Sequence, residues 1–456
     1  MNTWDQEGAV MGKKRSVKKA AGILVCLALI GLAGLYFWNA ESEEPRVSGL
    51  PQQASISPET PIQLEVHDDK SGLRSVQVTA VQKEKEHVVA QREFPQPVHT
   101  WDKEFTLDPA ELSDGQVTLE VRASDRSWRN WLKGNALHHT ASYEFDSQPP
   151  RISLESFQHN LRQGGSGVVA FRVSEPVRQA GVRIDDFFFP AYAQSEGFYV
   201  GFFSFPYTLK PDQGQLLVVA TDQAGNENKA GFHHYINQAR FNESSLPVTE
   251  GFLRNVIVNF QDQFPEEDTL LDVFLKVNQE MRQENRSRLR EIGRDTAPSP
   301  LWSGRFLRQP NASREAQFGT HRKYVYKGEV IDEQTHLGVD LASTARAEVP
   351  AANSGRVVFA DWLGIYGQVV IIDHGLGLQS LYAHLSQMGV EPGDPVEKGQ
   401  IIGRTGVTGL AGGDHLHFGM LISGLPVNPR EWWDEGWITN NIRPKLLLIE
   451  EGFSPE

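Results

Sequence analysis

The sequence predicts a mainly β protein of several domains behind one N-terminal transmembrane helix. Three observations predict this class. An uncharged apolar run spans 20–38, many short segments after it alternate apolar and polar residues, and the interval 241–300 has apolar residues at helical spacing. A chain of 456 residues is too long for one ordinary core. Its composition, 39% hydrophobic and 22% charged, is that of folded globular proteins.

The N-terminal region predicts a membrane anchor. Residues 1–19 form a basic cytoplasmic segment, because five of the seven residues 13–19 are Lys or Arg. The run 20–38 is long enough to span a bilayer, and the positive flank keeps its start inside the cell. A cleaved signal peptide is the alternative, but the aromatic end Tyr36-Phe37-Trp38 favours an uncleaved helix. The only cysteine, Cys26, lies in this run, so intramolecular disulfides are excluded.

The next segment, 39–57, is rich in Glu, Ser, Pro and Gln, which predicts a flexible stalk. Short alternating strands separated by turn residues then predict one β-sandwich module over 58–147 and a second over 148–240. The phrases Val121-Arg122-Ala123-Ser124-Asp125 and Val219-Ala220-Thr221-Asp222, each before a polar turn, are similar to the late hairpin of bacterial immunoglobulin-like domains. We therefore expect two immunoglobulin-like modules in tandem.

The second module has an aromatic cluster that allows two interpretations. Its members are Phe187, Phe188, Phe189, Tyr199, Phe202, Phe203, Phe205 and Tyr207. Such a cluster can bind sugar or peptide, but aromatic side chains also supply much of the buried area of small sandwiches. We favour core packing.

Residues 241–300 predict a helical linker. The acidic residues that follow Pro265 start a helix, and five apolar residues then recur at helical spacing. These residues are Leu270, Leu271, Phe274, Val277 and Met281. Such an amphipathic helix can pack on the domain that follows or cover its groove, and the sequence does not choose between the two.

Three short phrases near the C-terminus contain the residue types of a hydrolytic metal site. They read His336-Leu337-Gly338-Val339-Asp340, Tyr382-Ala383-His384 and His415-Leu416-His417. Catalytic zinc takes three imidazole or carboxylate ligands and keeps one position for water. Two imidazoles two residues apart project from the same face of a strand, so His415 and His417 can reach one site together.

These phrases resemble the lysostaphin-type, LytM-like zinc endopeptidases of peptidase family M23. The framework around them resembles that family as well, over roughly 301–437, and leaves 438–456 as a C-terminal tail. The matching phrases are Phe318-Gly319, 355–358, Tyr366-Gly367, His374-Gly375, 393–403 and 426–429. The resemblance implies a mostly antiparallel β domain, with the site in a groove whose walls are loops such as 362–364 and 409–412.

The resemblance also implies a role for each polar residue. His336, Asp340 and His417 are the expected ligands of Zn²⁺, and His384 and His415 are the expected catalytic pair. This chain has Asp414 directly before His415, where the family often has a small residue. Asp414 can therefore change the basicity of the pair or face away from it.

The implied activity is zinc-dependent hydrolysis of peptide cross-links in bacterial peptidoglycan, on the periplasmic side of the inner membrane. Some relatives have lost metal ligands and activate other wall hydrolases, so a non-enzymatic regulator with a protein partner is the alternative. A protein substrate or a glycine-rich peptide is a further one. The net charge of -14, without a basic stripe after the N-terminal segment, argues against nucleic acid as a partner.

Overall fold

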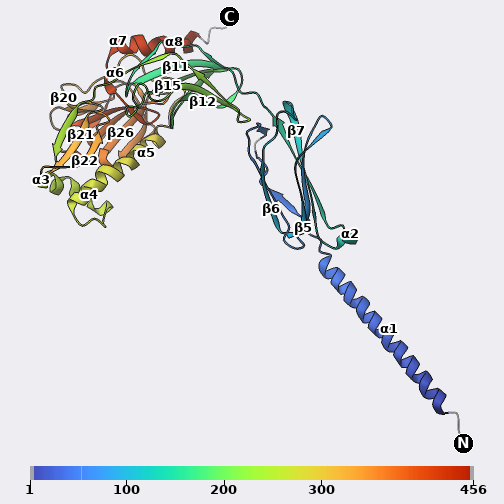
Figure 1. Cartoon of the computed structure of the whole chain (residues 1–456). Helices are drawn as coiled ribbons and strands as arrows, with labels where there is room; N and C mark the ends of the chain where they lie inside the picture. Colours follow the sequence, from blue (N-terminus) through green and yellow to red (C-terminus); the bar gives the residue numbers. More distant parts are fainter. Residues whose placement is uncertain (1–4, 53, 452–456) are drawn as a thin grey trace. The chain divides into compact units, whose positions relative to one another are not determined.

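The computed structural model describes residues 5–52 and 54–451, which form two compact units. One unit contains Met1–Pro149 with Gln223–Asn226, and the other contains Pro150–Asp222 with Glu227–Glu456 (Figure 1). The second β-sandwich and the C-terminal domain therefore belong to one unit, because their buried apolar residues form one continuous cluster. The described chain is mainly β, as the sequence predicts.

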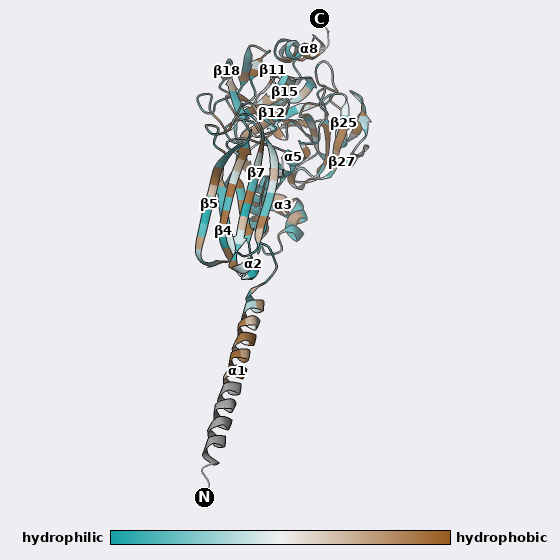
Figure 2. Cartoon of the chain, turned by 90° about the vertical axis from the view of Figure 1, so that its right-hand side faces the viewer, coloured by the Kyte–Doolittle hydropathy of each residue, from teal (hydrophilic) through white to brown (hydrophobic). Residues whose placement is uncertain are grey.

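The N-terminal helix α1 runs over Asp5–Asn39. Within α1, the 19-residue stretch Ala21–Asn39 is long and apolar enough to cross a membrane, and none of this stretch is buried inside the protein (Figure 2). The run contains no proline, so the helix can continue through it without a break. At a rise of 1.5 Å per residue, 19 residues are long enough for a hydrocarbon layer about 30 Å thick.

The first sandwich packs a five-stranded sheet, ordered β2-β8-β7-β4-β5, on a three-stranded sheet, ordered β1-β3-β6. Its elements are β1 Arg46–Ser48, β2 Ser55–Ile56, β3 Ile62–His67, β4 Leu73–Gln82, β5 Lys85–Val98, β6 Thr100–Phe105, β7 Gly115–Asp125, α2 Arg129–Leu132 and β8 Ala136–Phe145. Apolar residues at every second position face the core, as in β3, where Ile62, Leu64 and Val66 are buried.

The segment expected as a stalk differs from that expectation. Strand β1 pairs with β3, and β2 pairs with β8, so residues 46–48 and 55–56 are part of the sandwich. Backbone hydrogen bonds make both pairings, and these do not depend on the polar composition that suggested a flexible segment.

The second sandwich has two four-stranded sheets, ordered β14-β15-β11-β9 and β13-β12-β16-β17, and a parallel pair β10-β18. Its strands are β9 Ile152–Leu154, β10 His159–Arg162, β11 Ser166–Val173, β12 Val177–Ile184, β13 Phe187–Pro190, β14 Tyr192–Ser195, β15 Phe198–Ser204, β16 Leu217–Asp222, β17 Glu227–Gly231 and β18 His234–Asn237. Phe189, Phe202, Phe203 and Phe205 are at most 2% exposed, so the aromatic cluster fills the core.

The segment 241–300 combines one strand with several helices that pack on the C-terminal domain (Figure 1). It contains β19 Glu243–Pro247, α3 Glu250–Asn255, η1 Ile257–Gln263, α4 Leu270–Lys276, η2 Val277–Met281 and α5 Arg282–Ile292. The hydroxyls of Thr249 and Thr269 cap α3 and α4. Of the residues at helical spacing, Phe274, Val277 and Met281 are buried against that domain, and Leu270 and Leu271 are partly buried there.

The C-terminal domain is built on a curved antiparallel sheet ordered β20-β23-β30-β27-β26-β25-β28, and β19 joins a separate sheet with β21 and β22. Its strands are β20 Ser313–Ala316, β21 His321–Tyr326, β22 Glu329–Thr335, β23 Val339–Ala342, β24 Glu348–Pro350, β25 Gly355–Trp362, β26 Gln368–Asp373, β27 Leu378–Met388, β28 Pro395–Val396, β29 Ile401–Thr405, β30 Leu416–Ile422 and β31 Leu425–Val427. The turn η3 Gly364–Tyr366 precedes β26.

The chain after this sheet is helical, with α6 Pro429–Trp432, α7 Glu435–Trp437, η4 Ile438–Ile442 and α8 Arg443–Glu451. The interval expected as a tail therefore includes packed structure, because Ile438 and Ile442 are buried in the same apolar cluster as the second sandwich. Residues 452–456 of that interval lie outside the described part.

Candidate metal and catalytic site

Three neighbouring strands bring the three histidine phrases together. Asp340 on β23 is the register partner of His417 on β30, and His417 is the partner of Ala383 on β27, beside His384. His336 lies just before β23, and His415 lies just before β30. Residues up to 81 positions apart in the chain therefore meet. Asp340 and His417 face the same side of the sheet because they are register partners. His384 follows the in-register residue Ala383 and lies at an irregularity of the β26–β27 pairing, where its φ is left-handed.

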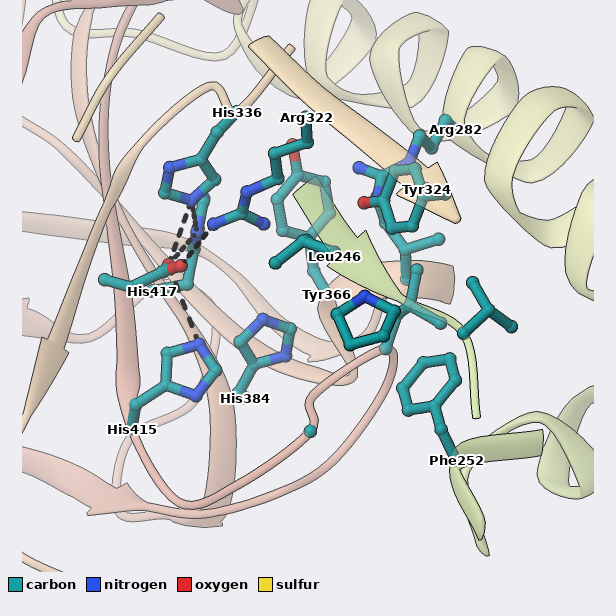
Figure 3. Close-up of a pocket in the computed structure, with 16 residues that line it drawn as sticks. Leu246, Phe252, Arg282, Arg322, Tyr324, His336, Tyr366, His384, His415 and His417 are labelled. Atoms are coloured by element: carbon teal, nitrogen blue, oxygen red, sulfur yellow. Dashed lines mark hydrogen bonds and ion pairs between the residues drawn. The ribbon is translucent and has the colours of Figure 1, made fainter. Parts of the chain in front are cut away.

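Three donor atoms converge at one point (Figure 3). His336 Nε2 lies 2.9 Å from Asp340 Oδ1 and 3.1 Å from His417 Nδ1, and His417 Nδ1 lies 2.9 Å from Asp340 Oδ1. Two ligands of a tetrahedral zinc ion at 2.0–2.1 Å are about 3.3 Å apart, close to these separations. His336, Asp340 and His417 as whole residues are 5%, 9% and 6% exposed, so the donor set is largely buried yet still lines a cavity. The residues present therefore fit a tetrahedral metal ion.

Hydrogen bonds outside the donor set orient its members. The Nδ1–H of His336 donates to the Gln317 carbonyl at 3.0 Å, which leaves Nε2 with the lone pair that a metal requires. Arg322 Nη2 donates to Asp340 Oδ2 at 2.7 Å, so the other carboxylate oxygen faces the two imidazoles.

The second pair of histidines lies beside the donor set. The ring centroids of His384 and His415 are 4.8 Å apart, and His415 Nε2 is 3.6 Å from Asp340 Oδ1. His384 Nδ1 pairs with the Thr408 carbonyl at 2.8 Å, and His415 Nδ1 pairs with the Gly413 carbonyl at 2.7 Å. Because a carbonyl only accepts, both Nδ1 atoms carry a proton, so in the neutral form of each ring the lone pair is on Nε2. His384 also has a left-handed φ of 62°, a costly conformation for this residue.

The electrostatics of the group follow from burial and close contact. Burial alone would raise the pKa of the Asp340 carboxyl, but the neighbouring imidazoles of His336, His415 and His417 hold this pKa well below its usual value. Burial lowers the pKa of His417 to about 4 and the pKa of His384 well below 6.5. Burial opposes protonation of His415 as well, yet contact with Asp340 leaves the pKa of His415 raised. Among the expected ligands, Asp340 is therefore favoured in its ionised form and His417 in its neutral form, the protonation states that metal ligands require.

A cavity of about 300 Å³ opens over these five residues. Its far wall comes from the segment 241–300, which contributes Leu246, Pro247, Val248, Phe252 and Arg282 (Figure 3). Of the two roles open to that segment, the structure shows packing on the domain together with a direct contribution to the cavity wall.

The loop predictions for the walls hold in part. Leu410 and Gly412 line the cavity, as expected of the loop 409–412. The other predicted loop, 362–364, contributes no lining residue, and its Trp362 is 46% exposed. The two residues that follow this loop, Ile365 and Tyr366, line the cavity instead.

Sequence reasoning gave no site role to four polar lining residues, Arg282, Arg322, Tyr324 and Tyr366, although Tyr366 belongs to a phrase that resembles the family framework. Arg322 and Tyr324 share one face of β21 by their spacing, but nothing in an alternating strand shows which face meets the site.

The structure also shows the surroundings of two further side chains near the site, Asp414 and His374. Asp414 faces away from the histidines, because its carboxylate accepts hydrogen bonds from Thr405 Oγ1 at 2.6 Å and the Arg346 amide at 3.1 Å. His374 is fully buried between the Ser354 carbonyl and the Ser380 hydroxyl, and burial lowers its pKa to about 4. Its role is structural.

The region that brings the five site residues together also matches a known protein family. Residues 334–429, which contain all five site residues, match the profile of Peptidase family M23. The chain carries a peptidase M23 domain. The domain includes β23, β27 and β30, so the sheet that holds the site is the matched region.

Relatives of this M23 domain include enzymes and an activator. DD-carboxypeptidase/endopeptidase Mpg of Neisseria meningitidis is 42% identical over 94 residues, which are 21% of this chain and 22% of Mpg. Murein hydrolase activator EnvC of Escherichia coli is 30% identical over 226 residues, which are 46% of this chain and 51% of EnvC. The chain therefore spans between about a fifth and a half of the length of these relatives.

Among solved structures, a putative peptidase M23 from Pseudomonas aeruginosa is 19% identical, with a TM-score of 0.35, over 59% of this chain and 93% of that one.

Proposed function

We propose that this protein is a zinc-dependent endopeptidase that hydrolyses peptide cross-links of bacterial peptidoglycan. The observation that carries the proposal is the convergence of His336 Nε2, Asp340 Oδ1 and His417 Nδ1 within 3.1 Å of one another, beside two more imidazoles and in an M23 domain. The similarity to Peptidoglycan DD-endopeptidase ShyA of Vibrio cholerae, 38% identical over 93 residues, supports peptidoglycan peptides as the substrate.

His336, Asp340 and His417 would hold the zinc ion. When bound there, zinc supplies Lewis-acid activation of a water molecule and of the peptide carbonyl. Arg322 fixes the Asp340 carboxylate, and Gln317 fixes the His336 ring, so the chain sets the donor geometry before metal arrives.

His384 and His415 would move the protons of the reaction. Each has Nδ1–H tied to a carbonyl and a lone pair on Nε2, so either ring can take the proton of the attacking water at Nε2. That proton then goes to the leaving amine nitrogen as the peptide C–N bond breaks, and the imidazole returns to its neutral form.

We propose that the domain works in the periplasm, attached to the inner membrane by α1. The apolar length Ala21–Asn39 and the basic residues 13–19 before it support this placement. Protease added to spheroplasts should degrade the C-terminal domain, and detection of a full-length protected chain would contradict the orientation.

The test of the activity uses the full chain in detergent and purified cross-linked peptidoglycan. We expect bound zinc near one ion per chain and release of uncross-linked muropeptides, seen by chromatography and mass spectrometry. The mass of each product shows which bond is cut. A chain that holds no zinc and releases no fragments would contradict the proposal.

A regulator is the second candidate, favoured by the long alignment with an activator of murein hydrolases. The presence of all five polar residues favours an enzyme instead. Hydrolysis that appears only after a separate amidase is added, and that is unchanged in Asp340→Ala, would support the regulator.

A further inference from the structure

The loop 128–133 between β7 and β8, which includes α2, presents two neighbouring large apolar side chains to the surroundings. Trp131 is 91% exposed and Leu132 is 58% exposed. The charged residues of the loop are Arg129 and Lys133, and both are basic and exposed. An exposed Trp-Leu pair costs free energy in water, so a surface that covers it is expected.

The exposure of this pair is built into the fold. Asp125 Oδ1 accepts hydrogen bonds from the amides of Ser127 and Asn135 and so closes the base of the loop. The guanidinium of Arg74 donates to the carbonyls of Leu132 at 2.9 Å and Lys133 at 3.1 Å.

The backbone of the loop is held in a costly conformation. Asn130, Trp131 and Leu132 have φ of 51°, 58° and 68°, three consecutive left-handed residues, none of them glycine. The surrounding hydrogen bonds maintain this conformation and direct the apolar side chains outward.

The loop contacts the end of the apolar helix. The Trp128 amide donates to the Asn39 carbonyl at 3.0 Å, and the Ser127 hydroxyl donates to the Glu41 carbonyl at 2.8 Å. Asn39 is the last residue of the stretch able to cross a membrane, and Phe37 and Trp38 before it are 77% and 87% exposed. The exposed pair therefore lies at the level where α1 would leave a bilayer.

We propose that Trp131 and Leu132 insert into the lipid surface that surrounds the end of α1, while Arg129 and Lys133 contact lipid phosphates. This proposal rests on the proposed membrane anchoring and goes beyond it. Tryptophan and basic residues are the types favoured at the headgroup level, where the indole is half in hydrocarbon and a cation meets phosphate. The loop would be a second attachment that fixes the first sandwich against the membrane.

The test places one cysteine at a time in the full chain. In a Cys26→Ser background, Trp131→Cys and Leu132→Cys are labelled with a polarity-sensitive fluorophore and reconstituted in vesicles of phosphatidylethanolamine and phosphatidylglycerol. The matched control is Val88→Cys, an exposed apolar residue of the same sandwich at 53%. Val88 is the register partner of Thr79 on β4, and Asp125 at the base of the loop is the register partner of Leu73 on the same strand. Thr79 and Leu73 are six residues apart, so Val88 lies about 20 Å along the sheet from the base of the loop.

We expect labels at 131 and 132 to emit at shorter wavelength than the label at 88. They should also be quenched by lipids that carry a nitroxide near the headgroup, and be several-fold less quenched by aqueous iodide. Labels that match position 88 in all three measurements would overturn the proposal. Protection from iodide without quenching by lipid would also overturn it, because the cover would then be protein.

A label on the natural Cys26 separates this proposal from the anchoring. A lipid-quenched label at 26 with water-like labels at 131 and 132 would leave the anchor intact and remove the loop insertion. A water-like label at 26 would remove both.

Discussion

Three of the four imidazoles of the site are held by a main-chain carbonyl. His336, His384 and His415 each place Nδ1 against such an oxygen, whereas His417 directs Nδ1 to the donor set. In the neutral ring the carbonyl fixes which nitrogen has the lone pair. The histidines proposed as metal ligands and those proposed as proton carriers therefore differ in position rather than in residue type. This distinction leads to separate predictions for the two kinds of histidine.

Removal of a ligand and removal of a proton carrier should have different effects. Asp340→Ala and His417→Ala should lose zinc and hydrolysis together, because each takes away a donor atom. His384→Ala should keep zinc and lose turnover by about 100-fold or more, the scale of general acid-base groups. Metal analysis beside a muropeptide release assay measures both. His321→Ala, a half-exposed histidine on β21, is the matched control, and loss of zinc in His384→Ala would contradict the assignment.

Arg322 should act on the metal through Asp340. Arg322→Gln removes the charged partner at 2.7 Å from Asp340 Oδ2, so zinc affinity should fall by about 10- to 100-fold, the scale of groups that orient ligands. Competition with a chelator measures the affinity. Arg314→Gln, an exposed arginine on β20, should have no effect. Equal affinity in Arg322→Gln and the natural chain would show that the ion pair is dispensable.

Gly338 should be needed for the position of His417. A Cβ added at Gly338 would lie 2.4 Å from His417 Nε2 and 2.5 Å from its Cε1, closer than real contacts allow. Gly338→Ala should therefore displace this ring and weaken zinc binding, as isothermal titration with zinc would show. Gly412→Ala, where an added Cβ meets no atom within 4 Å, is the control.

At the scale of elements, α6 is joined to the second sandwich through a buried carboxyl. The Ser166 amide at the start of β11 donates to Glu431 Oε2 at 2.9 Å, and burial raises the pKa of Glu431 to about 8. The folded chain therefore holds a proton on Glu431 at a pH where the unfolded chain, with an ordinary pKa of 4.5, does not.

This difference in pKa gives a dependence of stability on pH. Between pH 4.5 and about 8 the folded state binds more protons than the unfolded state, so the Glu431 contribution to stability is complete below pH 4.5 and declines as pH rises to 8. Glu431→Gln should reduce the loss of melting temperature between pH 5.5 and 8, measured by calorimetry of the full chain. Glu435→Gln on α7 is the control, and a pH profile unchanged in Glu431→Gln would contradict the prediction.

At the scale of the whole molecule, the site should link metal binding to stability. An ion that binds only the folded state stabilises it by about 2.7 kcal/mol at a concentration of 100 Kd. Zinc should therefore raise the melting temperature of the chelator-treated chain, and it should not do so in Asp340→Ala. An equal shift in both proteins would place the stabilising zinc elsewhere.

Much of the fold and of the candidate site is predictable from sequence because both depend on local patterns. The alternation in Ile62-Gln63-Leu64-Glu65-Val66 specifies a half-buried strand, and the uncharged stretch before residue 39 specifies a helix long enough for a bilayer. The five site residues occur in phrases of five residues or fewer, so their chemistry is visible without contacts.

Other features depend on pairings between distant parts of the chain. Strand β1 is too short and polar to be recognised until it pairs with β3, and Arg322 acquires a role only when β21 places it beside Asp340. The direction of Asp414, away from the histidines, depends on Thr405 of β29. No local pattern specifies such partners.

The sequence by itself determined the mainly β class and the apolar N-terminal helix, and it indicated the five polar residues that the structure brings together. Only the tertiary structure decided that Leu246, Pro247 and Arg282 form a wall of the cavity, and that Trp131 lies beside the end of α1. The physical reason is that propensity and periodicity act within a few residues, whereas a cavity wall or a surface loop is positioned by hydrogen bonds and packing between segments far apart in the chain.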